Sequence, residues 1–245
     1  MGSLPQRSEA IVLRHIDYGE ADQIITLLTP EQGLQKGFAK SARKSRKRFG
    51  ATLEPFTSAI FHWRAGKGSF WSLQEAELID ARFALRRDLR TLGHASYGVE
   101  LLELLVEEAH PSRQLYELLA GYLDFLAAAG GAETARLLLE LRLIQLLGYL
   151  PQLLHCSECR QLLTAQQLRF DLSRGGALCP HCTETAGIPV SRGTLGSLTR
   201  SLKVAHDRFS GFQFGATTHA EAHQLLQQVL RQLLPREPKS LGFLA

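Results

Sequence analysis

Hydrophobic and polar residues alternate along the first part of the chain with the two-residue period of β-strands. The turn cluster Pro30-Glu31-Gln32-Gly33 separates two of these segments, as expected for a hairpin. The pattern predicts strands at residues 10–16, 23–29, 33–39, 56–63 and 69–79. Five short strands within about 70 residues are typical of a small closed barrel of the oligonucleotide-binding (OB) type, although an SH3-like barrel or part of a β-sandwich would give nearly the same pattern.

From residue 82 the apolar positions recur at steps of three and four residues, which indicates amphipathic helices. Ser112 stands where an N-terminal cap is expected, and Gly130-Gly131 would end the same helix. Helices are predicted near residues 99–106, 115–126, 132–147, 191–204 and 218–234. The predicted fold class is therefore α+β, with an N-terminal five-stranded OB-fold barrel followed by an all-helical domain.

All four cysteines fall in one pattern, two Cys-x2-Cys pairs separated by 19 residues. A two-residue gap lets both thiolates of a pair reach a common centre, and two pairs complete the tetrahedron that Zn²⁺ prefers. We therefore expect one structural zinc ion in a closed ligand shell of Cys156, Cys159, Cys179 and Cys182. The rival interpretation, a redox-active Cys-x2-Cys, explains only one of the two pairs.

The cysteine segment interrupts the helical region, and the chain is predicted to have four parts. These are an OB-fold barrel at residues 1–80, the first part of a helical domain at 81–154, an inserted zinc module at 155–183, and the second part of the helical domain at 184–245. Within the zinc module, the residues Asp171-x3-Gly175 predict a short hairpin between the two cysteine pairs.

The positive charge of the chain is concentrated in one short run. The chain carries 28 Lys and Arg against 24 Asp and Glu, a formal charge of +4 that permits an anionic partner without identifying one. Residues 36–48 hold seven cations and no acid, namely Lys36, Lys40, Arg43, Lys44, Arg46, Lys47 and Arg48. Such a run can follow the phosphates of DNA, and it can also be a solvated, mobile loop.

Aromatic residues lie near this run in the sequence and could stack on bases. They are Phe38, Phe49, Phe61, Trp63, Phe70 and Trp71. Aromatic side chains on strands usually fill the interior of a small barrel, so core packing is the expected role for most of them.

The other candidate chemistry is weak. His219 and His223 are four residues apart on a predicted helix, but the glutamate of a zinc-protease motif stands one position late, so we interpret both as surface histidines. No nucleophile elbow or phosphate loop is present, and we predict a non-catalytic protein. No apolar run is long enough to cross a membrane, and Arg7, Glu9 and Arg14 interrupt any signal-peptide core, so we expect a cytoplasmic protein.

Several segments resemble the RecO family of bacterial recombination mediators. Residues 9–14 and 22–29 are similar to its opening strands, residues 36–46 to its basic segment, residues 49–56 to the following motif, and residues 140–151 to the stretch before its zinc module. The likeness extends in order over residues 8–183 and is weak after residue 187. One departure is Arg160, which stands where glycine is expected after the second cysteine.

This resemblance implies a DNA repair and recombination protein that binds single- and double-stranded DNA and anneals complementary strands. It implies that the protein acts near the nucleoid, with single-strand-binding protein and RecR, to load the RecA recombinase. It also implies that the tail of single-strand-binding protein docks on the helical domain, where Arg136 and Arg142 are candidate cations. The alternatives are a zinc-ribbon nucleic-acid-binding accessory factor and a metal-dependent nuclease.

Overall fold

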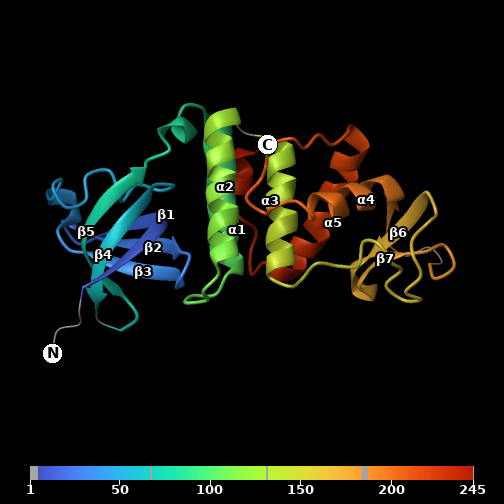
Figure 1. The fold of residues 1–245 in the computed structure, drawn as a ribbon, viewed down its shortest axis with the longest axis horizontal. Coiled ribbons are helices and arrows are strands. Elements are labelled where there is room, and N and C mark those ends of the chain that lie inside the picture. The colour runs from blue at the N-terminus through green and yellow to red at the C-terminus, as the bar shows by residue number, and fades with distance from the viewer. Residues whose placement is uncertain (1–4, 67, 131, 184–186, 245) are drawn as a thin grey trace. The chain divides into compact units, whose positions relative to one another are not determined.

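The computed structural model describes residues 5–66, 68–130, 132–183 and 187–244. By packing, the chain forms two compact units (Figure 1). Unit 1 contains residues 1–131 and 238–245, and unit 2 contains residues 132–237. Unit 2 is therefore an insertion in the sequence of unit 1.

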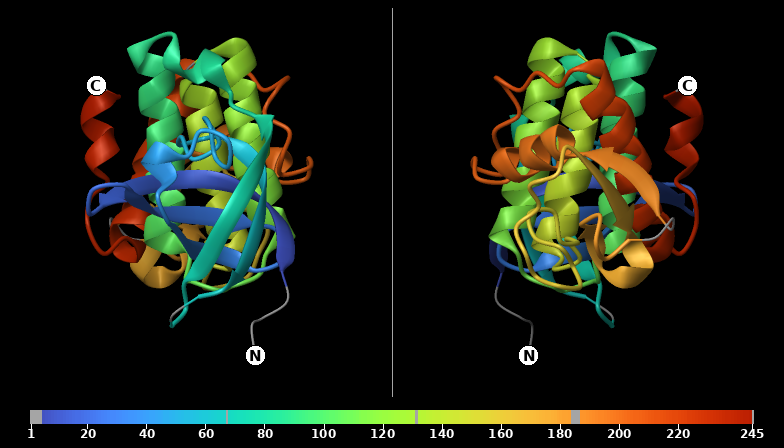
Figure 2. Two further views of the ribbon diagram at one scale, coloured as in Figure 1. Left: turned by 90° about the vertical axis from the view of Figure 1, so that its left-hand side faces the viewer. Right: turned by 90° about the vertical axis from the view of Figure 1, so that its right-hand side faces the viewer.

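Unit 1 begins with a closed five-stranded barrel in the order β1-β2-β3-β5-β4, which confirms the predicted OB-like fold (Figure 2, left). β3 and β5 pair in parallel, and the other neighbouring strands are antiparallel. The strands are β1 (Gln6–Tyr18), β2 (Asp22–Thr29), β3 (Gly33–Ala39), β4 (Ser58–Ala65) and β5 (Trp71–Asp80). β4 begins later than predicted because Phe56 has a positive φ of 70°, which is incompatible with an extended strand.

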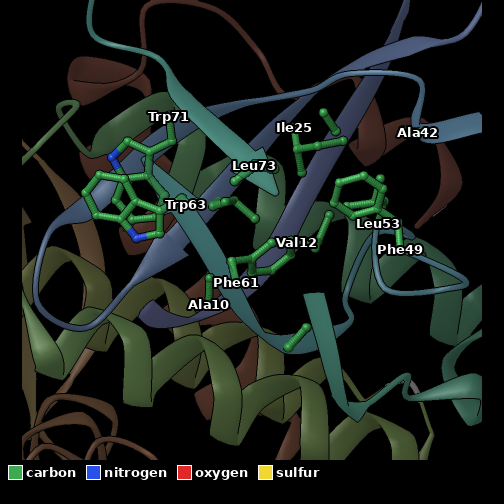
Figure 3. Close-up of a cluster of buried hydrophobic side chains, with 13 residues drawn as sticks. Ala10, Val12, Ile25, Ala42, Phe49, Leu53, Phe61, Trp63, Trp71 and Leu73 are labelled. Atoms are coloured by element: carbon green, nitrogen blue, oxygen red, sulfur yellow. The ribbon is translucent and has the colours of Figure 1, made fainter. Parts of the chain in front are cut away.

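Alternate residues of the strands fill the barrel interior (Figure 3). Phe61 is fully buried, and the indole rings of Trp63 and Trp71 stack in parallel with centroids 3.9 Å apart. Phe49 and Leu53 enter the same core from the segment that follows β3. The barrel core thus combines aliphatic residues with four aromatic ones, and the segment after β3 helps to close it.

Helices α1 (Leu89–Leu105) and α2 (Arg113–Ala129) complete the described part of unit 1, together with three short 3₁₀ helices, η1 (Ala42–Lys44), η2 (Phe83–Arg86) and η4 (Lys239–Phe243). The Asp88 carboxylate caps α1, and the Ser112 hydroxyl caps α2 as predicted, by accepting the Leu115 N–H. Gly130 ends α2 with a positive φ, whereas Gly131, expected at the same end, lies outside the described residues.

The end of the chain returns to α1. The Glu100 carboxylate of α1 accepts hydrogen bonds from the Lys239 N–H and from both the N–H and the hydroxyl of Ser240, at 2.7–3.0 Å. η4 packs on α1, where a Cβ on Gly93 would lie 3.1 Å from the Phe243 carbonyl oxygen. The last residues therefore belong structurally to the unit in which the chain begins.

Unit 2 combines three helices with a small antiparallel sheet of order β7-β6-β8 (Figure 2, right). A 3₁₀ turn, η3 (Leu172–Arg174), connects β6 to β7 as the predicted hairpin. The elements are α3 (Glu133–Leu146), β6 (Gln167–Asp171), β7 (Gly176–Leu178), β8 (Ile188–Ser191), α4 (Arg192–Ser201) and α5 (Ala216–Leu233). Helices thus surround the cysteine segment in the chain, as the sequence predicts.

In the structure, α1 and α2 belong to the same compact unit as the barrel. The change of sequence pattern near residue 80 instead predicts a domain boundary between the barrel and these helices. The buried Arg82 side chain contributes to this grouping, because it reaches both the barrel and α2. No helix in the described part of the chain combines the length and the hydropathy needed to span a bilayer.

Candidate metal centre and nucleic-acid interface

The four cysteines of unit 2 meet at one point. Their Sγ atoms all lie within 4.8 Å of one another, and the Cys159 and Cys179 sulfurs are 3.8 Å apart. Four thiolates bound tetrahedrally at about 2.3 Å from a zinc ion would have sulfurs about 3.8 Å apart. The donor set and its spacing therefore suit one metal ion with a closed shell, and the four cysteines are brought together as their spacing predicted.

Backbone hydrogen bonds shape each cysteine pair into a tight turn. In the first pair, the Arg160 N–H donates to the Cys156 carbonyl and the Cys156 N–H to the Gln161 carbonyl. In the second pair, the Cys182 N–H donates to the Cys179 carbonyl. Arg160 has a φ of 63°, the left-handed conformation that glycine adopts without strain, so the departure noted in the sequence falls on a position that does favour glycine.

The thiols are unequal in acidity. Burial acts to raise the pKa of Cys156, but the backbone N–H groups of Cys179, Cys159 and Glu158 outweigh it and lower the pKa to about 6. The neighbouring thiols Cys179 and Cys159 raise the pKa of Cys182 to about 12. Cys156 therefore ionises readily, whereas ionisation of Cys182 would be favoured by a cation at the centre of the cluster.

The hairpin of unit 2 lies directly against the first cysteine pair. The Gln152 N–H donates to the Gly175 carbonyl, and the Ala177 N–H donates to the Gln152 carbonyl. Gly176 has a φ of 139°, and a Cβ there would lie 2.5 Å from the Gln152 carbonyl oxygen. Only glycine fits this close approach of two backbones, which holds the hairpin beside the cysteines.

The basic run of residues 36–48 begins on β3 with Lys36 and continues in the segment that follows (light blue in Figure 2, left). Ala42, Phe49 and Leu53 anchor this segment in the barrel core. The Ser41 N–H also donates to the Asp22 carboxylate, at 2.6 Å. The run is consequently packed onto the barrel and is not a free chain of charges.

Three of the seven cations are engaged within unit 1. Lys36 pairs with Glu108, and the Arg43 guanidinium lies 3.7 Å from the Asp17 carboxylate. Arg48 lies over the Phe49 ring and donates to the Lys40 carbonyl and the Ser45 hydroxyl. The four cations that remain are exposed and have no partner among the described residues: Lys40, Lys44, Arg46 and Lys47. We call these four the free cations.

Most of the neighbouring aromatic residues are unavailable to a ligand, because Phe49, Phe61, Trp63 and Trp71 are buried in the barrel core. Phe38 and Phe70 are only partly buried, and the register of β3 places Phe38 on the outer surface. Ile16 pairs with Ile24, and Ile24 pairs with Phe38, so these three residues form one row across β1, β2 and β3. We call this set the outer row.

Tyr18 lies beside these three residues, and we include it in the outer row. The sequence pattern alone did not single it out. Its ring meets the Phe38 ring edge-on with centroids 5.8 Å apart, and Tyr18 is 57% exposed. Ile16 is also 46% exposed. The sequence could have indicated Tyr18 through strand alternation, because Ile16 and Tyr18 are two residues apart and occupy the same face of β1.

Arg136 and Arg142, the cations considered for partner docking, lie inside unit 2. Arg136 pairs with Glu140 at 2.9 Å and with Glu133 at 3.7 Å. Arg142 is 1% exposed and donates to the backbone carbonyls of residues 201, 206 and 208. These contacts stabilise the packing of unit 2, and a role in partner binding stays a prediction.

His219 and His223 differ from the expected surface histidines, because α5 packs on α3. The His219 Nε2 atom hydrogen-bonds the Thr134 hydroxyl at 2.9 Å, and the Arg136 guanidinium donates to His223 Nδ1 at 3.4 Å. Both rings are half-buried in this contact.

A five-stranded OB-like barrel, helices and a four-cysteine cluster together define the class of protein to which this chain belongs. Two family models match most of its residues. The model described as "Recombination protein O N terminal" matches residues 3–82, and the one described as "Recombination protein O C terminal" matches residues 86–242. The chain belongs to the RecO family of DNA repair proteins.

Curated relatives agree with this assignment. The chain is 47% identical over 240 residues to the DNA repair protein RecO of Syntrophotalea carbinolica, covering 97% of this chain and 93% of the relative. It is 37% identical over 241 residues to the protein of the same name from Roseiflexus sp. (strain RS-1), covering 97% and 84%. The similarity therefore includes both units.

Proposed function

We propose that the protein is a non-catalytic recombination mediator that binds single- and double-stranded DNA on its barrel and anneals complementary strands. The observation that supports this most is the position of the free cations, on a segment anchored to an OB-like barrel that also carries the outer row. Following the family, it acts in the cytoplasm at the nucleoid, with single-strand-binding protein and RecR, in loading RecA.

The two surface features have different physical roles in this proposal. The free cations neutralise phosphates, which releases counterions and makes binding strong and independent of sequence. The exposed Tyr18 ring offers a face for an unpaired base, and Phe38 supports it from the side. Bases are available for stacking only in single strands, so the outer row favours single-stranded DNA over duplex.

We propose one structural zinc ion for the cysteine cluster. Cys156, Cys159, Cys179 and Cys182 would hold it, and when bound it would join the two cysteine pairs into one folded module. Four thiolates leave no ligand position for a substrate or a water molecule, so this site does not support the nuclease alternative.

Salt dependence tests the nucleic-acid surface. Changing Lys40, Lys44, Arg46 and Lys47 together to Ala removes four phosphate contacts, at roughly 0.7 each in the log–log slope for single strands, so the slope should decrease by about 3. Titration of a fluorescent oligonucleotide at several salt concentrations measures it. Alanine at Arg87 and Arg231, exposed cations outside the basic run, is the control and should leave the slope unchanged.

Annealing tests the proposed activity itself. The wild-type protein should anneal complementary oligonucleotides, both bare and coated with single-strand-binding protein, and the quadruple variant should lose this activity. An unchanged salt slope would refute the proposed surface. DNA cleavage in Mg²⁺ or Mn²⁺ that persists through purification would instead favour the nuclease.

A further inference from the structure

Arg174 lies between the two cysteine pairs and contacts both. It stands at the end of η3, in the turn of the β6–β7 hairpin. Its Nε donates to the carboxylate of Glu158, at 2.6 Å, and Glu158 is one of the two residues between Cys156 and Cys159. Its Nη2 donates to the carbonyl of Cys182, also at 2.6 Å. One guanidinium therefore links the first pair to the last cysteine of the second.

We propose that Arg174 is a positioning residue for the metal, which holds the two cysteine pairs at the separation that a single ion requires. The inference rests on the zinc proposed above and extends it to a residue that is not a ligand. Arginine suits this task because its planar fork can engage a carboxylate and a carbonyl at the same time.

The local backbone fixes the direction of Arg174. The Asp171 carboxylate accepts hydrogen bonds from the N–H and the hydroxyl of Ser173, at 3.0 and 2.6 Å. Gly175 follows with a φ of 87°, and its N–H donates to the Leu172 carbonyl. A capped turn closed by glycine leaves Arg174 little freedom to move away from the cysteines.

Charge supports the same role. Four thiolates around one Zn²⁺ ion carry about two negative charges in excess. Arg174 brings a permanent cation to the Cys182 end of the cluster, while Glu158 keeps the guanidinium in place. Groups outside the ligand shell that orient ligands in this way typically change metal affinity by roughly 10- to 100-fold.

The test compares two arginines of the same hairpin. Arg174→Met removes the link between the pairs, whereas the control Arg169→Met removes an arginine of β6 that donates to the Gly187 carbonyl and contacts neither pair. Zinc affinity is measured by competition with a chromophoric chelator, and Co²⁺ loading reports the ligand geometry through its thiolate absorption bands. Because zinc binding is coupled to folding, a general loss of stability would also weaken the apparent zinc affinity, so the Co²⁺ bands of the folded, metal-loaded protein are the readout specific to positioning.

We expect zinc to bind roughly 10- to 100-fold more weakly to the Arg174→Met variant, with altered Co²⁺ bands, and normally to the Arg169→Met variant. Arg174→Lys should lose less zinc affinity than Arg174→Met, because a lysine keeps the charge, but it should remain below wild type, because it loses the fork. Equal zinc affinity in the two methionine variants would overturn the inference.

Two further outcomes are decisive. If Arg174→Met does not fold, the zinc affinity of Glu158→Ala tests the inference instead, because this variant keeps the arginine and removes the carboxylate that holds it at the first pair. An unchanged zinc affinity in Glu158→Ala would then overturn the inference. Wild-type protein that binds no zinc would refute the proposed metal itself, a result distinguishable from normal zinc binding with no effect of Arg174.

Discussion

The Arg82 guanidinium Nε lies 2.6 Å from the Asp124 carboxylate, and thereby joins the end of the barrel to the middle of α2. The same guanidinium donates at 2.8 Å to the Phe56 carbonyl and at 2.8 Å to the Ser58 hydroxyl. The Arg82 side chain is 5% exposed and the Asp124 side chain is 58% exposed. The buried contacts should consequently matter more than the ion pair.

We predict that Arg82→Met lowers the free energy of unfolding of unit 1 by about 3 kcal/mol, because it strands two buried acceptors. Asp124→Asn should cost less, about 1 kcal/mol, because Asp124 is mostly exposed and asparagine keeps an acceptor for the Arg82 Nε–H. Both tryptophans, Trp63 and Trp71, lie in the barrel core, so urea unfolding followed by their fluorescence measures unit 1. Equal losses in the two variants would contradict the prediction.

Tyr18 should contribute to binding single strands. Alanine at this position removes a stacking partner worth about 1–3 kcal/mol per base, so affinity for single-stranded DNA should fall roughly 5- to 150-fold. Tyr18→Phe keeps the ring and should bind nearly as well as wild type. Tyr149→Ala is the matched control, because Tyr149 is also 57% exposed. Fluorescence anisotropy measures all three, and comparable weakening by Tyr149→Ala would argue against a specific site.

Replacing Arg160 by glycine should stabilise unit 2, because Arg160 has a positive φ. A left-handed residue with a side chain costs about 1 kcal/mol, and glycine avoids that cost while adding freedom to the unfolded chain. Arg160→Gly should therefore raise the stability of unit 2 by up to about 1 kcal/mol. Arg169→Gly, within β6, should lower it by about 0.5–1 kcal/mol. Hydrogen exchange in the cysteine segment measures both changes, and destabilisation by Arg160→Gly would show that its side chain has a role of its own.

The stability of unit 2 should depend on pH through the Glu221 carboxylate. Burial acts to raise its pKa, but hydrogen bonds from Thr194 and Ser191 lower it below the ordinary value of 4.5. The carboxylate therefore stabilises the fold above pH 4.5, and this stabilisation is lost as the pH falls through the lowered pKa.

Glu221→Gln should be less stable than wild type at neutral pH and converge with it in acid. Exchange of the α4 amide hydrogens between pH 3 and 7 would measure this, because Ser191, the cap of α4, is the residue that Glu221 holds. Glu237→Gln, an exposed acid, is the control. A constant difference between Glu221→Gln and wild type over this range would refute the assignment.

Local patterns were sufficient to predict the strands and the cysteine cluster. Strand alternation is set by the two faces of each strand, and the positions of Val12, Ile25 and Phe61 inside the barrel follow from it directly. The Cys-x2-Cys spacing likewise carries its own geometry, so the four sulfurs could be expected to meet.

Contacts between distant residues could not be predicted in this way. Lys36 is neutralised by Glu108, which lies 72 residues away, so the sequence could not show which cations of the basic run are engaged. Glu100 receives Ser240 from 140 residues away, and no pattern in either segment indicates that pairing. Tyr18 falls between these cases, since its outward position follows from alternation but its contact with Phe38 depends on the register of β1, β2 and β3.

The contact between Glu100 and Ser240 sets an order of events during synthesis. A ribosome produces the barrel, α1 and α2 first, then all of unit 2, and only afterwards residues 238–244, which complete unit 1. Unit 1 is thus the first unit to emerge and the last to be completed. Until residues 238–244 have been made, α1 lacks the η4 segment that packs against it. A variant that ends at Glu237 would isolate this incomplete form.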